Sequence, residues 1–131
     1  MKKDQIDTLA SVREFHESYG LPVAHSANID DERVNGLRIE LIREELEELT
    51  EALKTRDLTE VLDALTDLQY VLDGAYLSFG LHGLKETAFS EVHRSNMSKA
   101  CTSEEEALQP LPAFSNPNFF GKNGLHVNNN P

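Results

Sequence analysis

The segment between Asp57 and Gly80 constrains the fold more than any other part of the chain, because as a helix it is apolar on two faces. At about 100° per residue, one face carries Val61, Leu65, Leu68, Leu72, Tyr76 and Phe79, and the other carries Ala64, Val71, Gly74 and Ala75. A helix that is apolar nearly all round is buried on both sides. We therefore expect this helix to run through the middle of the assembly.

Three further helices are predicted around it, and no segment shows the alternation of apolar and polar residues that is typical of a half-buried strand. Gly20 favours a C-terminal cap, and Asp57 has the spacing of a capping box in which the Glu60 side chain reaches back to the helix start. The predicted helices span residues 6–19, a second range from between 31 and 37 to 55, residues 57–79 and residues 84–100. The fold class is therefore all-α, with a four-helix bundle-like subunit.

The length of 131 residues allows one domain with a sizeable core and leaves little room for a second. We assign residues 1–101 to the all-α domain and residues 102–131 to an irregular C-terminal tail, which is rich in proline, glycine and asparagine. Four helices are too few to cover both apolar faces of the central one. The expected partner is a second copy of the chain, in a homodimer or a dimer of dimers.

The charge balance excludes several classes of function. Twelve Lys and Arg residues against 23 Asp and Glu residues give a formal net charge of −11. This argues against binding a nucleic-acid polymer, because such affinity comes mainly from neutralising phosphates. No stretch approaches the roughly 20 apolar residues needed to span a membrane. The single cysteine and the lack of an apolar signal segment near the start favour a cytoplasmic protein.

Two aspartates border an apolar face of the central helix. Asp63 and Asp67 lie one turn apart, within about 40° of each other. Like charges at this spacing repel, and desolvating them without a cation is unfavourable. A positive charge, such as that of a metal ion, is therefore expected between them. The alternative is a structural ion pair of either aspartate with Arg38 or Arg43.

The preceding helix supplies a matching set of carboxylates in Glu44, Glu45 and Glu48, and Glu45 borders the core. The short link at residues 54–57 predicts that this helix and the central one lie side by side and antiparallel. Four or five carboxylates then converge. Oxygen ligands of this kind favour Mg²⁺ or Mn²⁺, whereas His and Cys, which would favour zinc, are absent from both segments. A lone acidic run of this kind would otherwise be a solvated face.

The last predicted helix changes character along one stripe. It begins apolar with Ala88, Phe89 and Val92 and continues as Asn96 and Lys99. An amide and an ammonium group near a carboxylate and metal cluster suit phosphate oxygens, because both donate hydrogen bonds and the lysine adds positive charge.

Three separated segments, residues 38–49, 63–75 and 91–99, resemble in sequence and order the MazG-like and phosphoribosyl-ATP pyrophosphohydrolase-like all-α nucleotide pyrophosphohydrolases. The likeness covers roughly residues 12–101. It implies a hydrolase that uses Mg²⁺ or Mn²⁺ to cleave a nucleoside triphosphate into the monophosphate and pyrophosphate. Phosphoribosyl-ATP is an alternative substrate, and a catalytically inactive dimerisation module is the alternative to an enzyme.

The resemblance also implies roles for individual carboxylates. The family binds metal with an EExxE motif and an ExxD motif on adjacent helices. The first motif matches Glu44, Glu45 and Glu48. Glu45 and Glu48 are thereby implied as metal ligands, and one of Glu44 and Glu45 as the general base that activates water.

The second motif departs from the family pattern, because Ala64 stands where the family has a glutamate. We expect Asp63 to take that role beside Asp67 as a metal ligand. An alternative frame reads Glu60 and Asp63 as the motif and leaves Asp67 aside. The chosen frame is favoured because the capping box already explains Glu60.

Asn96 and Lys99 are similar to the family's Asn-x-x-Lys, which implies contacts with phosphate or nucleotide. Tyr70 either stacks on a nucleobase or packs at a helix interface. A two-iron oxidoreductase on a helical bundle would need Glu-x-x-His pairs. The chain has none, and the pairs Glu14 with His16 and Glu91 with His93 have the wrong spacing.

Overall fold

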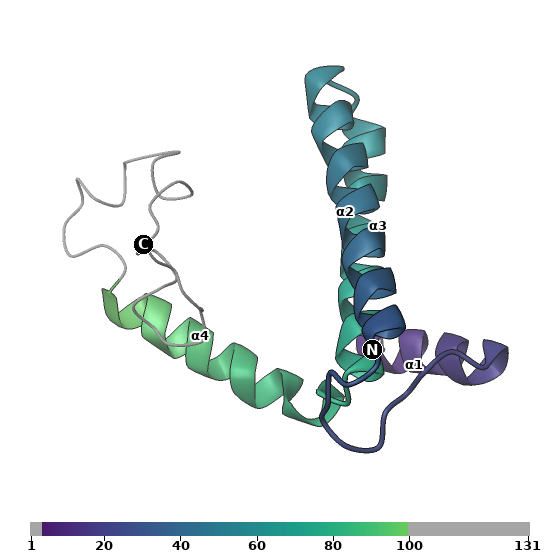
Figure 1. Cartoon of the computed structure of the whole chain (residues 1–131). Helices are drawn as coiled ribbons and strands as arrows, with labels where there is room; N and C mark the ends of the chain where they lie inside the picture. Colours follow the sequence, from purple (N-terminus) through teal and green to yellow (C-terminus); the bar gives the residue numbers. More distant parts are fainter. Residues whose placement is uncertain (1–3, 100–131) are drawn as a thin grey trace. The chain divides into compact units, whose positions relative to one another are not determined.

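The computed structural model describes residues 4–99, and these form four α-helices, one 3-10 turn and no strand. The elements are α1 (Thr8–Tyr19), α2 (Glu32–Lys54), α3 (Leu58–Ser78), η1 (His82–Leu84) and α4 (Lys85–Lys99) (Figure 1). The all-α prediction is confirmed. The predicted tail at residues 102–131 and the domain boundary before it lie outside the described residues.

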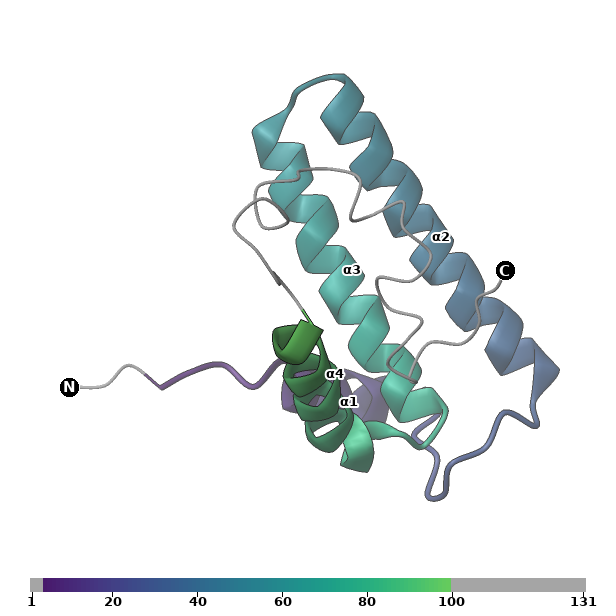
Figure 2. The ribbon, with the colours of Figure 1, turned by 90° about the vertical axis from the view of Figure 1, so that its left-hand side faces the viewer.

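Helices α2 and α3 form an antiparallel hairpin and lie side by side along their lengths (Figure 2). Asp31 caps α2 by accepting hydrogen bonds from two backbone N–H groups at 3.0 and 3.3 Å. Asp57 caps α3 by accepting from the Glu60 N–H at 3.1 Å. The Asp57 N–H donates to the Ala52 carbonyl at 3.0 Å. That bond closes the turn and takes the place of the predicted return bond from the Glu60 side chain.

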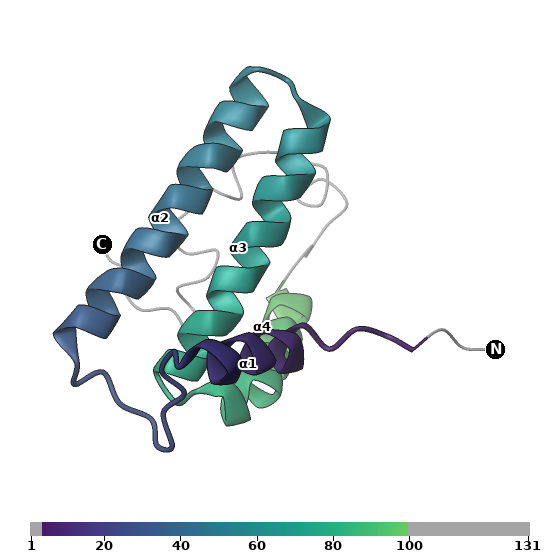
Figure 3. The ribbon, with the colours of Figure 1, turned by 90° about the vertical axis from the view of Figure 1, so that its right-hand side faces the viewer.

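Helix α1 lies across the end of the hairpin at which α2 begins and α3 ends (Figure 3). It ends at Gly20, whose φ of 68° is the left-handed conformation that glycine adopts readily. Beyond it, the Pro22 carbonyl accepts hydrogen bonds from His16 Nδ1 at 3.0 Å and from Ser78 Oγ at 3.4 Å. These bonds fasten α1 and the following loop to the end of α3.

The two faces of α3 differ in burial within residues 4–83. Ala64 and Ala75, on one face, are buried. Leu65 and Leu72, on the other, are exposed. Within this single chain, the other helices therefore cover one face of α3 more completely than the other. Burial of both faces in an assembly of several copies stays a prediction.

Exposed apolar residues follow both helices of the hairpin at a spacing of seven residues. Most of them come one residue, about 100°, after a buried position between the two helices. Ile39, Leu53 and Leu65 follow the buried Arg38, Ala52 and Ala64 in this way. Because the helices are antiparallel, the two rows point to the same side of the hairpin. The hairpin stripes, as we call them, are between 43% and 80% exposed and consist of Ile39, Leu46 and Leu53 on α2 and of Leu58, Leu65 and Leu72 on α3.

The chain divides into two compact units after Gly83, so α4 is described by itself. Within α4, Arg94 pairs with Glu91 one turn earlier, with an N–O distance of 2.6 Å. No helix among residues 4–99 is long and apolar enough to cross a membrane.

Candidate metal centre

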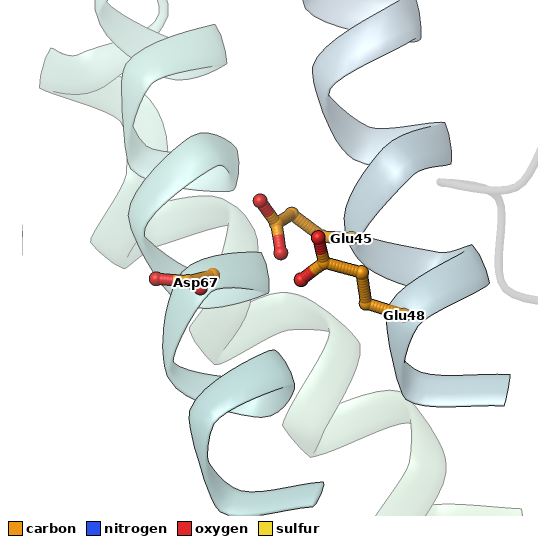
Figure 4. Close-up of side chains that lie close together, drawn as sticks. All are labelled: Glu45, Glu48 and Asp67. Atoms are coloured by element: carbon orange, nitrogen blue, oxygen red, sulfur yellow. The ribbon is translucent and has the colours of Figure 1, made fainter. Parts of the chain in front are cut away.

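Three carboxylates converge where the middle of α2 faces the middle of α3. Glu45 and Glu48 lie one turn apart on α2, and Asp67 faces them from α3 (Figure 4). One oxygen of each residue lies within 4.8 Å of those of the other two. Glu45 and Asp67 are half-buried, whereas Glu48 is exposed. We call this group the carboxylate trio.

Among residues 4–99, no ion pair joins the carboxylate trio to a Lys or Arg side chain. Burial raises the pKa of Glu45, and the neighbouring carboxylates of Glu48 and Asp67 raise it further. Glu45 Oε2 is shielded from solvent and has no hydrogen-bond partner among residues 4–99. A cation among the three oxygens would satisfy that acceptor and offset the repulsion. The trio therefore fits a metal ion, and its all-oxygen donor set suits a hard divalent one.

Glu44 and Asp63 were predicted to join this cluster, but in the described residues both are exposed and outside the trio. The rotation of α3 about its own axis explains the position of Asp63. Asp63 precedes the buried Ala64 by one residue, so about 100° of helix rotation turns it away from the packed face, and it is exposed.

The other residues that the sequence offers as ion-pair partners of these aspartates, or as a ligand beside them, also have definite positions. Arg43 pairs with Glu40 on its own helix, with an N–O distance of 2.5 Å. Arg38 is buried two turns away from the trio, against Gly74. Glu60 is exposed in the first turn of α3. Within the described chain, neither arginine forms the predicted ion pair with an aspartate.

An aromatic group lies beside the trio. Tyr70 follows Asp67 by one turn, and its ring packs edge-on against Phe15 of α1, with 5.9 Å between centroids. Phe15 in turn lies 4.8 Å from the ring of Tyr19. All three aromatic residues are partly exposed. Tyr70 therefore contacts α1 at a helix interface, and part of its side chain remains exposed to solvent.

Asn96 and Lys99 lie one turn apart at the end of α4, in the second compact unit. Both are half-buried. Their role in binding phosphate stays a prediction.

A buried polar group, which the sequence pattern does not reveal, lies where α1 meets the hairpin. His16 and Arg38 are 2% and 4% exposed. A side chain at Gly74 would overlap Arg38 Nη1 and come within 3.2 Å of His16 Nε2, so the glycine leaves room for both. A glycine inside a helix is a sequence signal for close approach. It does not indicate which side chain fills the space.

The fold and the carboxylate trio define an all-α protein in which a helical hairpin gathers three carboxylates with the spacing of a metal site. Residues 12–96, more than half of the chain, match the family described as phosphoribosyl-ATP pyrophosphohydrolase. The chain belongs to this family, within the all-α MazG-like superfamily. The resemblance predicted from the three sequence segments is thereby confirmed.

The chain is also similar to an uncharacterized protein of Acanthamoeba polyphaga mimivirus, with 34% identity over 76 residues. The aligned segment covers 55% of this chain and 30% of that protein. The chain thus spans less than a third of the length of this curated relative.

Proposed function

We propose that this protein hydrolyses a nucleoside triphosphate, ribo or deoxy, to the monophosphate and pyrophosphate, with Mg²⁺ or Mn²⁺ as cofactor. The carboxylate trio is the observation that carries the proposal. Family membership supports hydrolysis of a phosphoanhydride bond. The net charge of −11 supports a metal, because an acidic chain repels a polyanionic substrate unless a cation intervenes.

Glu45, Glu48 and Asp67 would hold the ion, and Asp63 is the further predicted ligand one turn away. Such an ion supplies neutralisation of phosphate charge and a lowered pKa for a nearby water. Glu44, exposed and next to the trio, suits the role of general base better than Glu45 if Glu45 is a ligand. The base accepts a proton from the attacking water, the water oxygen bonds to phosphorus, and the bridging oxygen leaves with pyrophosphate.

Substrate binding is assigned to Asn96, Lys99 and Tyr70, as the sequence predicts. Asn96 and Lys99 would donate hydrogen bonds to phosphate oxygens and offset charge on the leaving pyrophosphate. Tyr70 would stack on the base with its exposed part. Replacing either Asn96 or Lys99 by Ala is expected to raise the KM for the nucleotide at least about tenfold, as one lost charge-assisted hydrogen bond predicts.

Phosphoribosyl-ATP is the second candidate substrate, and the description of the family favours it. Its triphosphate contains the same type of bond, so the trio would serve both substrates equally well. The base and sugar preferences distinguish the two candidates.

The full chain is incubated with a panel that includes dUTP, dCTP, other nucleoside triphosphates and phosphoribosyl-ATP, with Mg²⁺, with Mn²⁺ or with EDTA. We expect metal-dependent release of pyrophosphate rather than single phosphate. Glu48→Gln and Asp67→Asn should lower kcat at least about a hundredfold, since each removes a charged ligand. Glu47→Gln, at an exposed position of α2, is the matched control. Full activity in both ligand variants, or no turnover by the wild type, contradicts the proposal.

We further propose that a second copy of the chain covers the hairpin stripes. A spacing of seven residues is typical of helices that pack along each other in coiled coils. Large apolar side chains that gather in one patch mark an interaction surface more often than scattered ones do. A two-fold axis would bring the same patch of each subunit together, because such an interface is self-complementary.

A further inference from the structure

Arg38 is a buried cation for which no anion appears among the described residues. Only 4% of it is exposed, and its Nε atom is shielded from solvent without a hydrogen-bond partner within residues 4–99. By contrast, Arg13, Arg43 and Arg94 each pair with a glutamate on their own helix. Burial lowers the pKa of Arg38. Because a buried charge without a partner is strongly unfavourable, we expect an anion here.

Among residues 4–99, no ion pair joins Arg38 to a carboxylate. His16 Nδ1 lies 3.0 Å from the Pro22 carbonyl, which only accepts, so Nδ1 carries the proton. Burial lowers the pKa of His16, and Arg38 adds to that effect against the opposing hydrogen bond, so the ring is neutral near pH 7. Asp73, a buried carboxylate of α3, accepts a hydrogen bond from Gln69 Nε2 at 3.0 Å.

Arg38 also lies in line with the carboxylate trio. It precedes Glu45 by seven residues, so both share one face of α2 about 10 Å apart along the axis. On α3, Gly74 follows Asp67 by the same interval and leaves room for Arg38 Nη1. The guanidinium is therefore on the line of contact between the two helices, two turns nearer to α1 than the trio.

We propose that Arg38 binds a phosphate group of the nucleotide, two helical turns from the carboxylate trio. This assignment rests on the proposed pyrophosphohydrolase function. A guanidinium presents its N–H groups in a planar fork that matches two phosphate oxygens.

Inorganic pyrophosphate is the probe, titrated calorimetrically into the full chain in EDTA so that no metal contributes. The wild type is expected to bind it. Arg38→Met should weaken the Kd at least about tenfold, the loss expected for one charged hydrogen bond. Arg43→Met is the matched control, because Arg43 is exposed and paired with Glu40, and its Kd should equal that of the wild type. Glu45→Gln should also leave this metal-free binding intact, which separates the Arg38 site from the trio.

An unchanged Kd in Arg38→Met, or no binding by the wild type, overturns the assignment. If Arg38→Met does not fold, Arg38→Lys keeps the positive charge and loses the fork, and an unchanged Kd in that variant overturns it equally. Absence of nucleotide turnover together with Arg38-dependent pyrophosphate binding refutes the proposed function and supports the phosphate site. If Arg38→Lys hydrolyses the nucleotide with the KM of the wild type and binds pyrophosphate with the Kd of the wild type, the phosphate site is refuted and the proposed function is not.

Discussion

Burial and the charges of three neighbouring carboxylates together hold the pKa of Glu45 above the ordinary value of 4.5. At neutral pH the folded state therefore carries an unfavourable charge, and this penalty disappears as pH falls through the raised pKa. Glu45→Gln should increase the free energy of unfolding in EDTA by about 0.5 kcal/mol and remove most of the stabilisation that Mg²⁺ gives. Urea denaturation with EDTA and with Mg²⁺ measures both effects. Glu47→Gln is the control and should keep the Mg²⁺ stabilisation of the wild type. If Glu45→Gln also keeps it in full, the result counts against the metal site.

His16 gives the fold a second dependence on pH. Burial lowers its pKa below the ordinary 6.5, so the unfolded chain takes up a proton at a higher pH than the folded chain does. Its contribution to stability is therefore complete above pH 6.5 and is lost as pH falls below that value toward the folded pKa. Urea denaturation between pH 5 and 8 should show this loss. His16→Gln should flatten that part of the profile, whereas His25→Gln, at an exposed position, should retain it.

The turn between α2 and α3 contains one strained residue. Arg56 has a φ of 54°, in the left-handed region that side chains other than glycine rarely adopt. Arg56→Gly should increase the free energy of unfolding by about 0.5 to 1 kcal/mol, because the gain exceeds the entropy that glycine loses. Arg33→Gly, in the first turn of α2, should decrease it by about 1 kcal/mol. A lower urea midpoint in Arg56→Gly would show that its side chain stabilises the turn.

At the scale of the helices, the sequence predicts where a helix begins and ends better than it predicts which side chains of two helices meet. Gly20 and Asp57 define where α1 ends and α3 begins, because capping depends on residues adjacent in sequence. Which carboxylates converge is a different matter. It depends on which face each of the two helices turns toward the other, and Asp63 and Asp67, one turn apart, look equivalent in the sequence. The sequence likewise does not predict that Arg38 packs against Gly74, because that contact depends on how the two helices are placed together.

At the scale of the whole molecule, the hairpin stripes predict a dimer. Leu46→Glu and Leu65→Glu place charges in the middle of the proposed interface, so each should shift the chain toward monomer in sedimentation velocity experiments at micromolar concentration. Ile6→Glu is the matched control, because Ile6 is an exposed apolar residue outside the hairpin. A wild-type chain that sediments as a monomer, or variants that remain dimeric, would rule out this interface.

The carboxylate trio draws all its members from two helices that are consecutive in sequence and joined by a tight turn. Contacts over such short separations form early during folding, because little chain entropy is lost in closing the loop. Closure of the hairpin thus brings three negative charges together while much of the chain is still unstructured. In kinetic terms, a divalent ion bound by the trio would lower the barrier to that closure. We therefore expect the protein to fold faster when the ion is present from the start than when it is added afterwards.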